Sequence, residues 1–487
     1  MRSNRGDILL SVLVFAAIAV TVVIGLVNWG AAMLSEIRTV AIREQTFQIA
    51  EAGIDYYRWH LAQSPNDYQD GSTSTGPYYH NFYDKNNNPV GSYSLEITPP
   101  PLGSTRVVIL STASTTANPK IVRKIRAILA QPSLAQFAVV ANDDLRFGAG
   151  TSVYGPVVAN GGIHFDGVAY NVISSAKNTY TDPDTGLTQW GVWTQVSPAD
   201  PRPQTPVINH PTVFTAGRQF PVPAADFAGL TLNLQQLQTA SYTAGACTAP
   251  ACWVPSGALG YHIVLRTDGK FNIYKVTQLQ SAPNNCTNSN NQAQWGTWSI
   301  KVNNSGTLTG QTLIGTYSYP TNGIIFVEDS LWIDGQVNGA RLTIASGVFP
   351  DPGVGSQPNI TVNNDLKYTN FDGTDVIGLI AQGNLNVGLL SPDDLTIDGA
   401  LVSENGRVGR YYYDSDCRVN NTNYYARSVL TLTGMIASNK RYGFAYTDGT
   451  GYDTRDITYD GNLLYSPPPS FPLASTQYQT VSWKEVW

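Results

Sequence analysis

The feature that most constrains this chain is an apolar run without any charged residue, from Ile8 to Leu34. Its only polar side chains are those of Ser11, Thr21 and Asn28. As an α-helix rising about 1.5 Å per residue, the run is longer than the hydrocarbon core of a membrane requires. Arg2 and Arg5 precede it, so the positive-inside tendency places this end of the chain in the cytoplasm.

The helix is expected to continue well beyond the apolar run. Apolar residues recur at steps of three and four, which marks one face of a helix, at Phe47, Ala50, Ile54, Tyr57 and Leu61. The first proline is Pro65. We therefore expect one helix from about Ile8 to Gln63, roughly 84 Å long. A cleaved secretory signal has a much shorter apolar region, and an uncleaved signal anchor is the main alternative.

A short basic leader ending at Gly6, the apolar helix and the stretch "QTFQIAEAG" (Gln45–Gly53) together resemble the N-terminus of type IV pilin-like proteins, and in particular of PilX-type minor pilins. The resemblance covers about the first 62 residues. It implies that a prepilin peptidase cuts between Gly6 and Asp7. It also implies that the helix contacts other pilins and the pilus assembly platform, with the bulk of the chain outside the cytoplasmic membrane or on a pilus at the cell surface.

Two residues depart from the pattern of that family. An apolar residue usually begins the mature chain, where this sequence has Asp7, and the fifth mature residue is usually Glu, where this sequence has Ser11. The family's glutamate is thought to pair with a neighbouring subunit's amine in the apolar fibre core, where an unpaired charge is costly. The departures favour a position at the tip of a fibre over one along its shaft.

After Pro65 the sequence predicts a small antiparallel sheet that packs against the amphipathic helix. Alternating apolar residues predict strands at Ser92–Thr98, Arg106–Thr112 and Ile121–Leu129. The stretch Asp84–Pro89 superficially resembles a calcium loop, but it lacks the glycine and the terminal glutamate of such loops, so a hairpin turn is expected and calcium is a weak alternative.

The rest of the chain carries an internal repeat. "VVANDDLRFGAG" (Val139–Gly150) returns 18 residues later as "VVANGGIHFDGV" (Val157–Val168), and "LTIDGALVSENG" (Leu395–Gly406) returns 35 residues later from Leu430. Short strands joined by polar corners cannot bury their apolar side chains alone, but stacked coils bury them as one column. We therefore predict a mainly β protein, with the long helix and a right-handed parallel β-helix, and a β-sandwich as the alternative.

These patterns divide the chain into six segments. They are a leader (1–6), the transmembrane or assembly half of the helix (7–34), a pilin-like module (35–131), the first β-helix coils (132–177), an insertion with loops and a subsidiary sheet (178–319), and the remaining coils with a C-terminal strap (320–487). The strap, rich in proline and aromatic residues, is expected to close the last coil.

Four cysteines, Cys247, Cys252, Cys286 and Cys417, suit two disulfides in an oxidising compartment, with the connectivity open. A zinc site is the weaker alternative, because the sequence has no CxxC pair. The net charge of −6 offers no basic surface for a phosphate backbone, so nucleic acid is not an expected partner.

Candidates for chemistry are few, and no cofactor is expected. Parallel β-helices can host polysaccharide-cleaving enzymes, and the candidate carboxylates are Asp143, Asp144, Asp166, Asp329, Asp334, Asp393, Asp394 and Asp398. Asp166, Asp334 and Asp398 recur at one position of the repeat, which favours turn capping over catalysis. His164 is expected to point outward into solvent, because it lies between Ile163 and Phe165 in a repeat strand.

Aromatic residues leave room for ligand binding. Those that could stack on sugar rings or anchor a protein partner are Trp190, Trp193, Trp295 and Trp298, and the run Tyr411–Tyr413, although filling a core is the more ordinary role. The sequence as a whole predicts a non-enzymatic minor pilin that displays a β-helical domain for adhesion to a glycan or cell-surface ligand, or for pilus assembly. The alternative is a membrane-anchored, β-helical carbohydrate-active enzyme or glycan-binding protein.

Overall fold

The computed structural model describes residues 5–100, 104–133, 135–225, 227, 229–281, 286, 299–353, 355–419, 422–473 and 477–486, without the side chains of residues 5–7 and 229–233. The chain forms two compact units. Unit 1 comprises residues 1–100, 106–130 and 477–487, and unit 2 comprises residues 101–105 and 131–476. Unit 2 is therefore inserted between two segments of unit 1.

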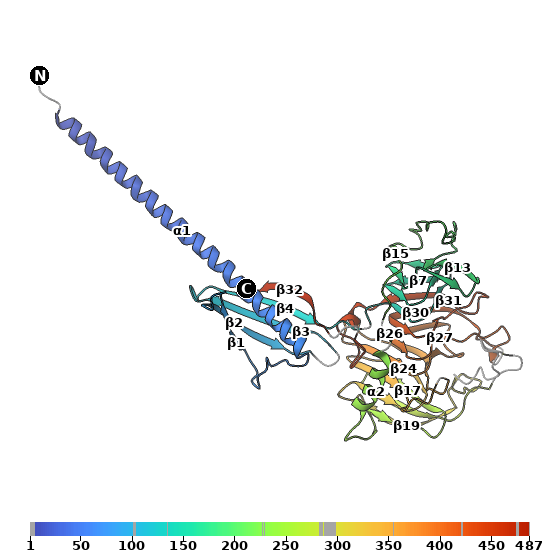
Figure 1. The fold of residues 1–487 in the computed structure, drawn as a ribbon. Helices are drawn as coiled ribbons and strands as arrows, with labels where there is room; N and C mark the ends of the chain where they lie inside the picture. Colours follow the sequence, from blue (N-terminus) through green and yellow to red (C-terminus); the bar gives the residue numbers. More distant parts are fainter. Residues whose placement is uncertain are drawn as a thin grey trace. The chain divides into compact units, whose positions relative to one another are not determined.

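Unit 1 contains the long helix and one antiparallel sheet (Figure 1). The helix is α1 (Arg5–Gln63), as the periodicity predicts. The sheet has the order β1 (Tyr78–Tyr83), β2 (Pro89–Thr98), β3 (Val107–Thr115), β4 (Val122–Ala130) and β32 (Gln479–Val486). The three predicted strands are present as β2, β3 and β4. The Asp84 loop joins β1 to β2 as a hairpin, where its carboxylate accepts the amides of Asn86 and Asn88, each at 2.8 Å.

The C-terminal half of α1 packs on the sheet by the predicted face. Ala50, Ile54, Tyr57 and Leu61 are each no more than 4% exposed and belong to one apolar cluster with the sheet. Gly53 allows the close approach, because a Cβ at this position would lie 2.5 Å from Ser111 Oγ. The glycine of "QIAEAG" is thus explained by helix–sheet packing.

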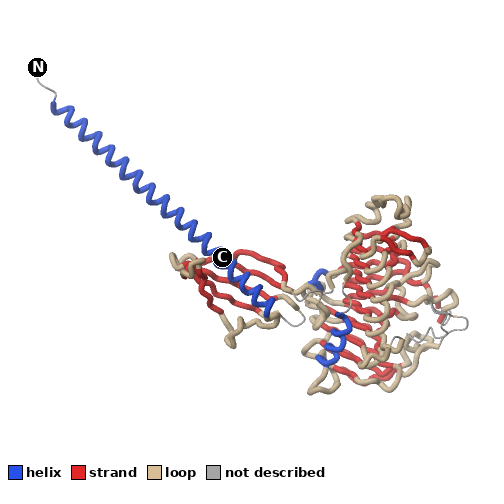
Figure 2. Tube along the Cα trace, in the orientation of Figure 1, coloured by secondary structure: helices blue, strands red, loops and turns tan. Residues whose placement is uncertain are grey.

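Unit 2 is a solenoid, by which we mean a stack of coils whose strands pair in parallel with those of the next coil (Figure 2). One column of paired strands runs through it in the order β16 (Cys252–Trp253), β20 (Ile324–Val327), β22 (Arg341–Ser346), β24 (Val376–Ala381), β26 (Asp394–Ser403), β30 (Ala426–Ser438), β5 (Val139–Ala141), β8 (Val157–Ala159), β11 (Ile173–Ser175) and β15 (Arg218–Gln219). The parallel pairing excludes the β-sandwich alternative.

Further columns complete the coils. One contains β17 (Gly260–Leu265), β21 (Leu331–Gln336), β23 (Ile360–Lys367), β25 (Leu385–Val387) and β27 (Val408–Arg410). A short one contains β6 (Leu145–Phe147), β9 (Ile163–Phe165) and β14 (Val192–Trp193). A third joins β26 and β30 to β31 (Gly451–Tyr459), β7 (Thr151–Tyr154) and β10 (Val168–Ala169). The apolar side chains between these columns form the main core.

Both repeat registers predicted from the sequence are confirmed. Val139 pairs with Val157, which is the 18-residue step, and Leu395 pairs with Leu430, which is the 35-residue step. Register follows the apolar pattern because a slip of one residue would turn every buried side chain outward.

The order of the coils along the stack differs from their order in the sequence. β30 pairs with β5, and β31 pairs with β7, so the last coil stacks on the first (Figure 1). We call this junction the seam. The chain therefore enters the stack at its middle, builds toward one end, and crosses to the other end before it returns. The segment 178–319 is accordingly not a single insertion, because β14 to β17 lie within it and extend the columns at both ends.

The remaining elements cover the stack or extend it. They are two hairpins, β12 (Thr179–Asp182) with β13 (Leu187–Trp190) and β28 (Arg418–Val419) with β29 (Thr422–Asn423); the antiparallel strands β18 (Lys270–Val276) and β19 (Gln311–Ser318); α2 (Gly229–Ser241); and the short helix η2 (Gly461–Leu464). Leu234 and Leu237 of α2, with Leu463 and Phe471, bury the outer apolar face of the longest column.

The sequence predicted that the C-terminal segment closes the last coil, but the segment lies elsewhere. Residues 466–471 lie along the flank of the stack, where the Pro469 carbonyl accepts a hydrogen bond from Thr343 Oγ1 at 2.5 Å. β32 then returns to unit 1 and pairs with β4. The flank needs this cover because its apolar side chains point away from the main core. β32 pairs with β4 because the edge of β4 would otherwise have no strand partner.

Candidate functional site

The first candidate site is the exposed half of α1. The segment from Ile8 contains a window with a mean hydropathy of 2.9, no part of which is buried, and it is long and apolar enough to cross a membrane. Ser11 lies on this exposed surface. Gly6 and Asp7 lie in the first turn, where the side chains are outside the described part of the chain. The N-terminal half of α1 thus has an apolar surface that unit 1 leaves uncovered, whereas its C-terminal half is packed on the sheet of unit 1.

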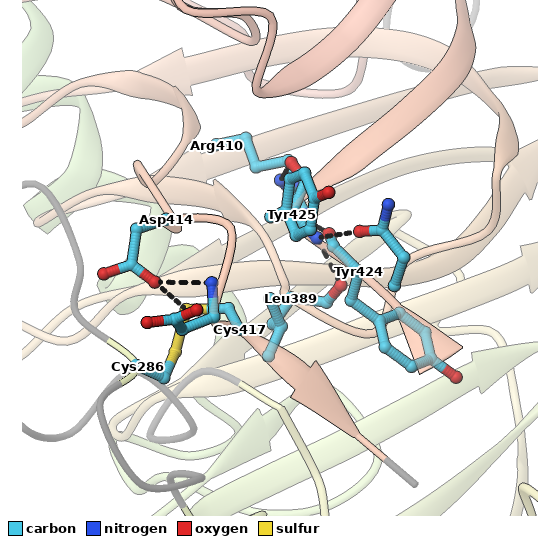
Figure 3. The surroundings of a disulfide bond; sticks show 9 residues. Cys286, Leu389, Arg410, Asp414, Cys417, Tyr424 and Tyr425 are labelled. Atoms are coloured by element: carbon cyan, nitrogen blue, oxygen red, sulfur yellow. Dashed lines mark hydrogen bonds between the residues drawn. A yellow bond between two sulfur atoms is a disulfide. The ribbon is translucent and has the colours of Figure 1, made fainter. Parts of the chain in front are cut away.

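The four cysteines form two disulfides, Cys247–Cys252 and Cys286–Cys417. Their sulfurs are consequently not thiolate ligands for zinc. Figure 3 shows the second disulfide beside the loop that follows β27. In this loop the backbone carbonyl of Asp414 accepts the amide of Cys417 at 3.0 Å. The disulfide ties Cys286, across 131 residues of sequence, to a loop packed around Leu389 and Tyr413.

A fully buried arginine organises the same loop (Figure 3). Arg410 donates to the carbonyls of Leu389, at 3.1 Å, and Tyr425, at 3.2 Å, and its guanidinium lies 4.9 Å from the ring centroid of Tyr413. Burial lowers the pKa of Arg410. These contacts give Tyr413, which has no exposed surface, a structural role.

His164 is buried, contrary to the expectation from strand alternation. Its ring stacks on Trp193 with centroids 4.0 Å apart, and its Nε2 lies 2.9 Å from Asp166 Oδ2. The hairpin of β12 and β13 and the following β14 supply the cover, which a local alternation pattern does not reveal. Burial raises the pKa of Asp166, but hydrogen bonds from His164 and from the Gln195 amide outweigh it and leave that pKa below its usual range.

His164, Asp182 and Asp184 lie close enough together to share a cation. Asp184, however, already accepts hydrogen bonds from Arg146 Nη1 at 2.9 Å and Arg441 Nη2 at 2.6 Å. Burial by itself raises the pKa of Asp184, but the two arginines have the larger effect, so that pKa lies below its usual value. The arrangement is that of a neutralised ion-pair cluster.

The two candidate stacking tryptophans that the structure describes, Trp190 and Trp193, pack against other side chains. Trp193 is 2% exposed and donates its Nε1 hydrogen to Tyr180 Oη at 2.9 Å. Trp190 lies against Phe220, with ring centroids 5.9 Å apart. Trp295 and Trp298 lie outside the described residues. The two that are described fill the space between the β12–β13 hairpin and the coils.

The candidate carboxylates mostly cap backbone amides. Asp166 accepts the amide of Gln195 at 2.8 Å, Asp329 that of Ser256 at 2.8 Å, and Asp398 that of Tyr368 at 3.0 Å. Asp393 accepts from Ser428, Asp143 from Asp144, and Asp144 from Gly162. This is the turn-capping role that their place in the repeat favours.

Asp334 differs from these carboxylates. It lies 3.0 Å from Nε2 of His262, which is 1% exposed and whose Nδ1 is 2.7 Å from Gln311 Oε1. The sequence placed Asp334 in the repeat but offered no signal for its histidine partner, because β17 pairs with β21 only through the stacking of distant coils.

The chain has a distant similarity to a solved structure. No family model matches the sequence, and no curated protein matches it. The crystal structure of the competence-associated pilin ComZ from Thermus thermophilus aligns with 91% of this chain and 98% of that chain, at 14% identity and a TM-score of 0.29. The chain is thus distantly similar to that pilin, and the similarity assigns neither a family nor an activity.

Proposed function

We propose that this chain is a minor pilin-like protein, anchored by its N-terminal helix and incorporated in or at the tip of a type IV pilus. The observation that carries the proposal is the division of α1 into an uncovered apolar half and a half buried in unit 1. Water is a poor environment for such a surface, so lipid covers it before assembly and other pilin helices cover it afterwards. Unit 2 is then the displayed domain, available for adhesion or for assembly.

The proposed processing follows the same logic. A prepilin peptidase removes residues 1–6, and the apolar helix then starts at Asp7. With Ser11 in place of a glutamate, the helix lacks the carboxylate that pairs with a neighbour, which supports a terminal position. The cytoplasmic membrane holds the unassembled chain with its bulk on the extracytoplasmic side, and the assembly platform and other pilins are its partners.

We also propose that the chain is not an enzyme, and that its coils are right-handed. Backbone amides already occupy the repeat-position carboxylates Asp166 and Asp398. Crossover connections between parallel strands of one sheet are right-handed in about 98% of cases, which supports right-handed coils.

The proposal is tested by shearing fibres from cells that produce the chain at its natural level. The wild-type chain is expected in the sheared fraction, while a Gly6→Asn variant, blocked in processing, is expected to stay in the membrane. Glu96→Gln, an exposed change in unit 1, serves as the control and should behave as the wild type. Recovery of the wild-type chain only from membranes would refute a role in the fibre.

A further inference from the structure

A cavity of about 720 Å³ lies on the seam of the solenoid. Its walls come from residues 146–151 of the first coil and residues 441–455 of the last coil, with Arg407, Asp166 and Asp184 beside them. The two main segments lie about 300 residues apart in the sequence, so the cavity exists only when β31 has paired with β7. Neither half of the repeat contains this site by itself.

The charges around the cavity are unequal. Four arginines line it, Arg146, Arg407, Arg441 and Arg455, against three aspartates, Asp166, Asp184 and Asp453. Arg146 and Arg441 are paired with Asp184. Among the described residues, no carboxylate forms an ion pair with Arg407 or Arg455. Arg407 and Arg455 thus have no ion-pair partner in the part of the chain that the structure describes, although the charge of Asp453 acts on Arg455 without forming an ion pair.

Arg455 holds the seam together and contributes charge rather than free donors. Its guanidinium donates to the Tyr452 carbonyl at 2.6 Å, to the Gly148 carbonyl at 3.3 Å and to Thr151 Oγ1 at 2.8 Å. Burial lowers its pKa. Carbonyl dipoles therefore satisfy its hydrogen bonds, while its full charge adds to the potential of the cavity.

Arg407 has donor capacity to spare. Its Nη2 donates to the Arg410 carbonyl and, at 3.2 Å each, to the Gly443 carbonyl and Tyr446 Oη. Among the described residues, its Nη1 has no hydrogen-bond partner, and neither has its Nε, which is buried. A buried donor without a partner is costly, and charge-assisted bonds to a carboxylate are among the strongest that arginine makes. Nη1, which is neither buried nor hydrogen-bonded among the described residues, is the donor available to an incoming carboxylate.

The rest of the wall is polar and partly aromatic. Thr447, Asp453 and Thr450 bring hydroxyl and carboxylate oxygens, and the edge of Tyr446, held against Tyr412 with ring centroids 5.2 Å apart, adds an aromatic surface. Such a mixture matches a ligand with several hydroxyl groups in addition to its charge. A nucleic acid carries one negative charge per nucleotide. Asp453, Asp184 and the net charge of −6 would repel it, so a nucleic acid is not the favoured ligand.

We propose that this cavity binds an acidic saccharide, that is, a sugar residue bearing a carboxylate. The carboxylate pairs with Arg407 and Arg441, and the hydroxyl groups meet Asp453 and Thr447. The site uses the unpaired donor and the uncompensated charge of the seam, and it does not depend on whether the chain enters a fibre.

The test uses the full chain in detergent and isothermal titration with three acidic trisaccharides, built on galacturonate, glucuronate and sialate. Galactose trisaccharide is the neutral probe, and inorganic sulfate and a ten-residue oligothymidylate are the other anions. At least one acidic trisaccharide is expected to bind at least tenfold more tightly than the neutral one. Arg407→Gln should weaken that binding tenfold or more, and Arg407→Lys should weaken it less, because it keeps the charge.

Arg266→Gln is the matched control, since Arg266 is a partly exposed arginine in the β17–β18 turn and does not line the cavity. It should leave the affinity unchanged, and thermal unfolding of each variant establishes that it is folded. If Arg407→Gln does not fold, Arg407→Lys and the fall of affinity with added salt take its place. The proposal would be overturned if none of the three acidic sugars binds, or if the neutral sugar binds equally well. It would also be overturned if the affinity is unchanged in both Arg407→Lys and Arg407→Gln, or if sulfate or the oligothymidylate binds preferentially.

Discussion

Arg123 on β4 and Glu485 on β32 form a salt bridge across 362 residues of sequence, with Nη2 of the arginine 2.6 Å from Oε2 of the glutamate. Trp483 on the same last strand meets the ring of Phe47 on α1 edge to face, at 5.6 Å between centroids. The C-terminal strand is therefore part of unit 1, and residues 131–476 of unit 2 are inserted between the neighbouring strands β4 and β32.

Loss of this salt bridge should destabilise unit 1. Both side chains are about one-fifth exposed, so Glu485→Ala is expected to lower the free energy of unfolding by about 1 kcal/mol. Urea unfolding of the full chain in detergent, followed by hydrogen exchange in β4, measures the effect. Lys484→Ala changes the exposed neighbour and should have no comparable effect. Equal effects of the two substitutions would contradict a specific role for the salt bridge.

The seam should depend on Arg455. Arg455→Gln removes donors to the Gly148 carbonyl and to Thr151 Oγ1 in the first coil, and we expect a loss of about 2 kcal/mol or more in the free energy of unfolding. Hydrogen exchange should accelerate first in β7 and β31. Arg266→Gln removes an exposed ion pair with Asp268 and is expected to change little. Acceleration spread evenly over the solenoid would argue against a local seam.

The two disulfides should differ in their contribution to stability. In the chain-entropy model, a link across 131 residues stabilises by about 5 kcal/mol and one across 5 residues by about 2 kcal/mol. Replacing Cys286 and Cys417 by serine should therefore lower the unfolding midpoint more than replacing Cys247 and Cys252. Thermal unfolding of the two double variants makes the comparison, and the reverse order would show that the longer link stabilises less than chain entropy predicts.

Asp398 should make the solenoid less stable as the pH rises. Burial raises its pKa above the unfolded value of about 3.9, so ionisation costs the folded state as pH increases through that range. Asp398→Asn removes the cost and should unfold at a higher midpoint than the wild type at pH 7, with little difference near pH 3.

Asp372 provides the opposite case. Hydrogen bonds from the Thr374 side chain and amide lower its pKa, so its stabilisation is present above about pH 4 and is lost as the pH falls. Asp372→Asn should therefore lose a little stability at pH 7. Denaturant unfolding of both variants from pH 3 to pH 8 measures the signs, and the same sign in both would contradict the assignment.

Local patterns in the sequence predicted the features that depend on neighbours along the chain. The buried face at Ala50, Ile54 and Tyr57 follows from helical periodicity, and the pairing of Leu395 with Leu430 follows from the repeat itself. Each of these depends on a short stretch and its copy, which carry the same apolar spacing in the sequence and in the fold.

Features that depend on the order of the coils could not be predicted in this way. Repeats look alike whichever end of the stack they occupy, so nothing in the sequence around Ile436 indicates that it pairs with Val139. The burial of His164 comes from Trp193 on β14 and from the β12–β13 hairpin, which lie outside its own coil. The cavity beside Arg407 likewise requires the seam, and β32 has the alternation of any edge strand.

The most direct test of the proposed function is the intact mass of the chain recovered from sheared surface fibres, compared with the chain in the membrane. A pilin-like subunit processed between Gly6 and Asp7 is expected to begin at Asp7 in the fibre fraction. A chain that retains Met1 and is found only in membranes would contradict the account and identify the helix as an uncleaved anchor.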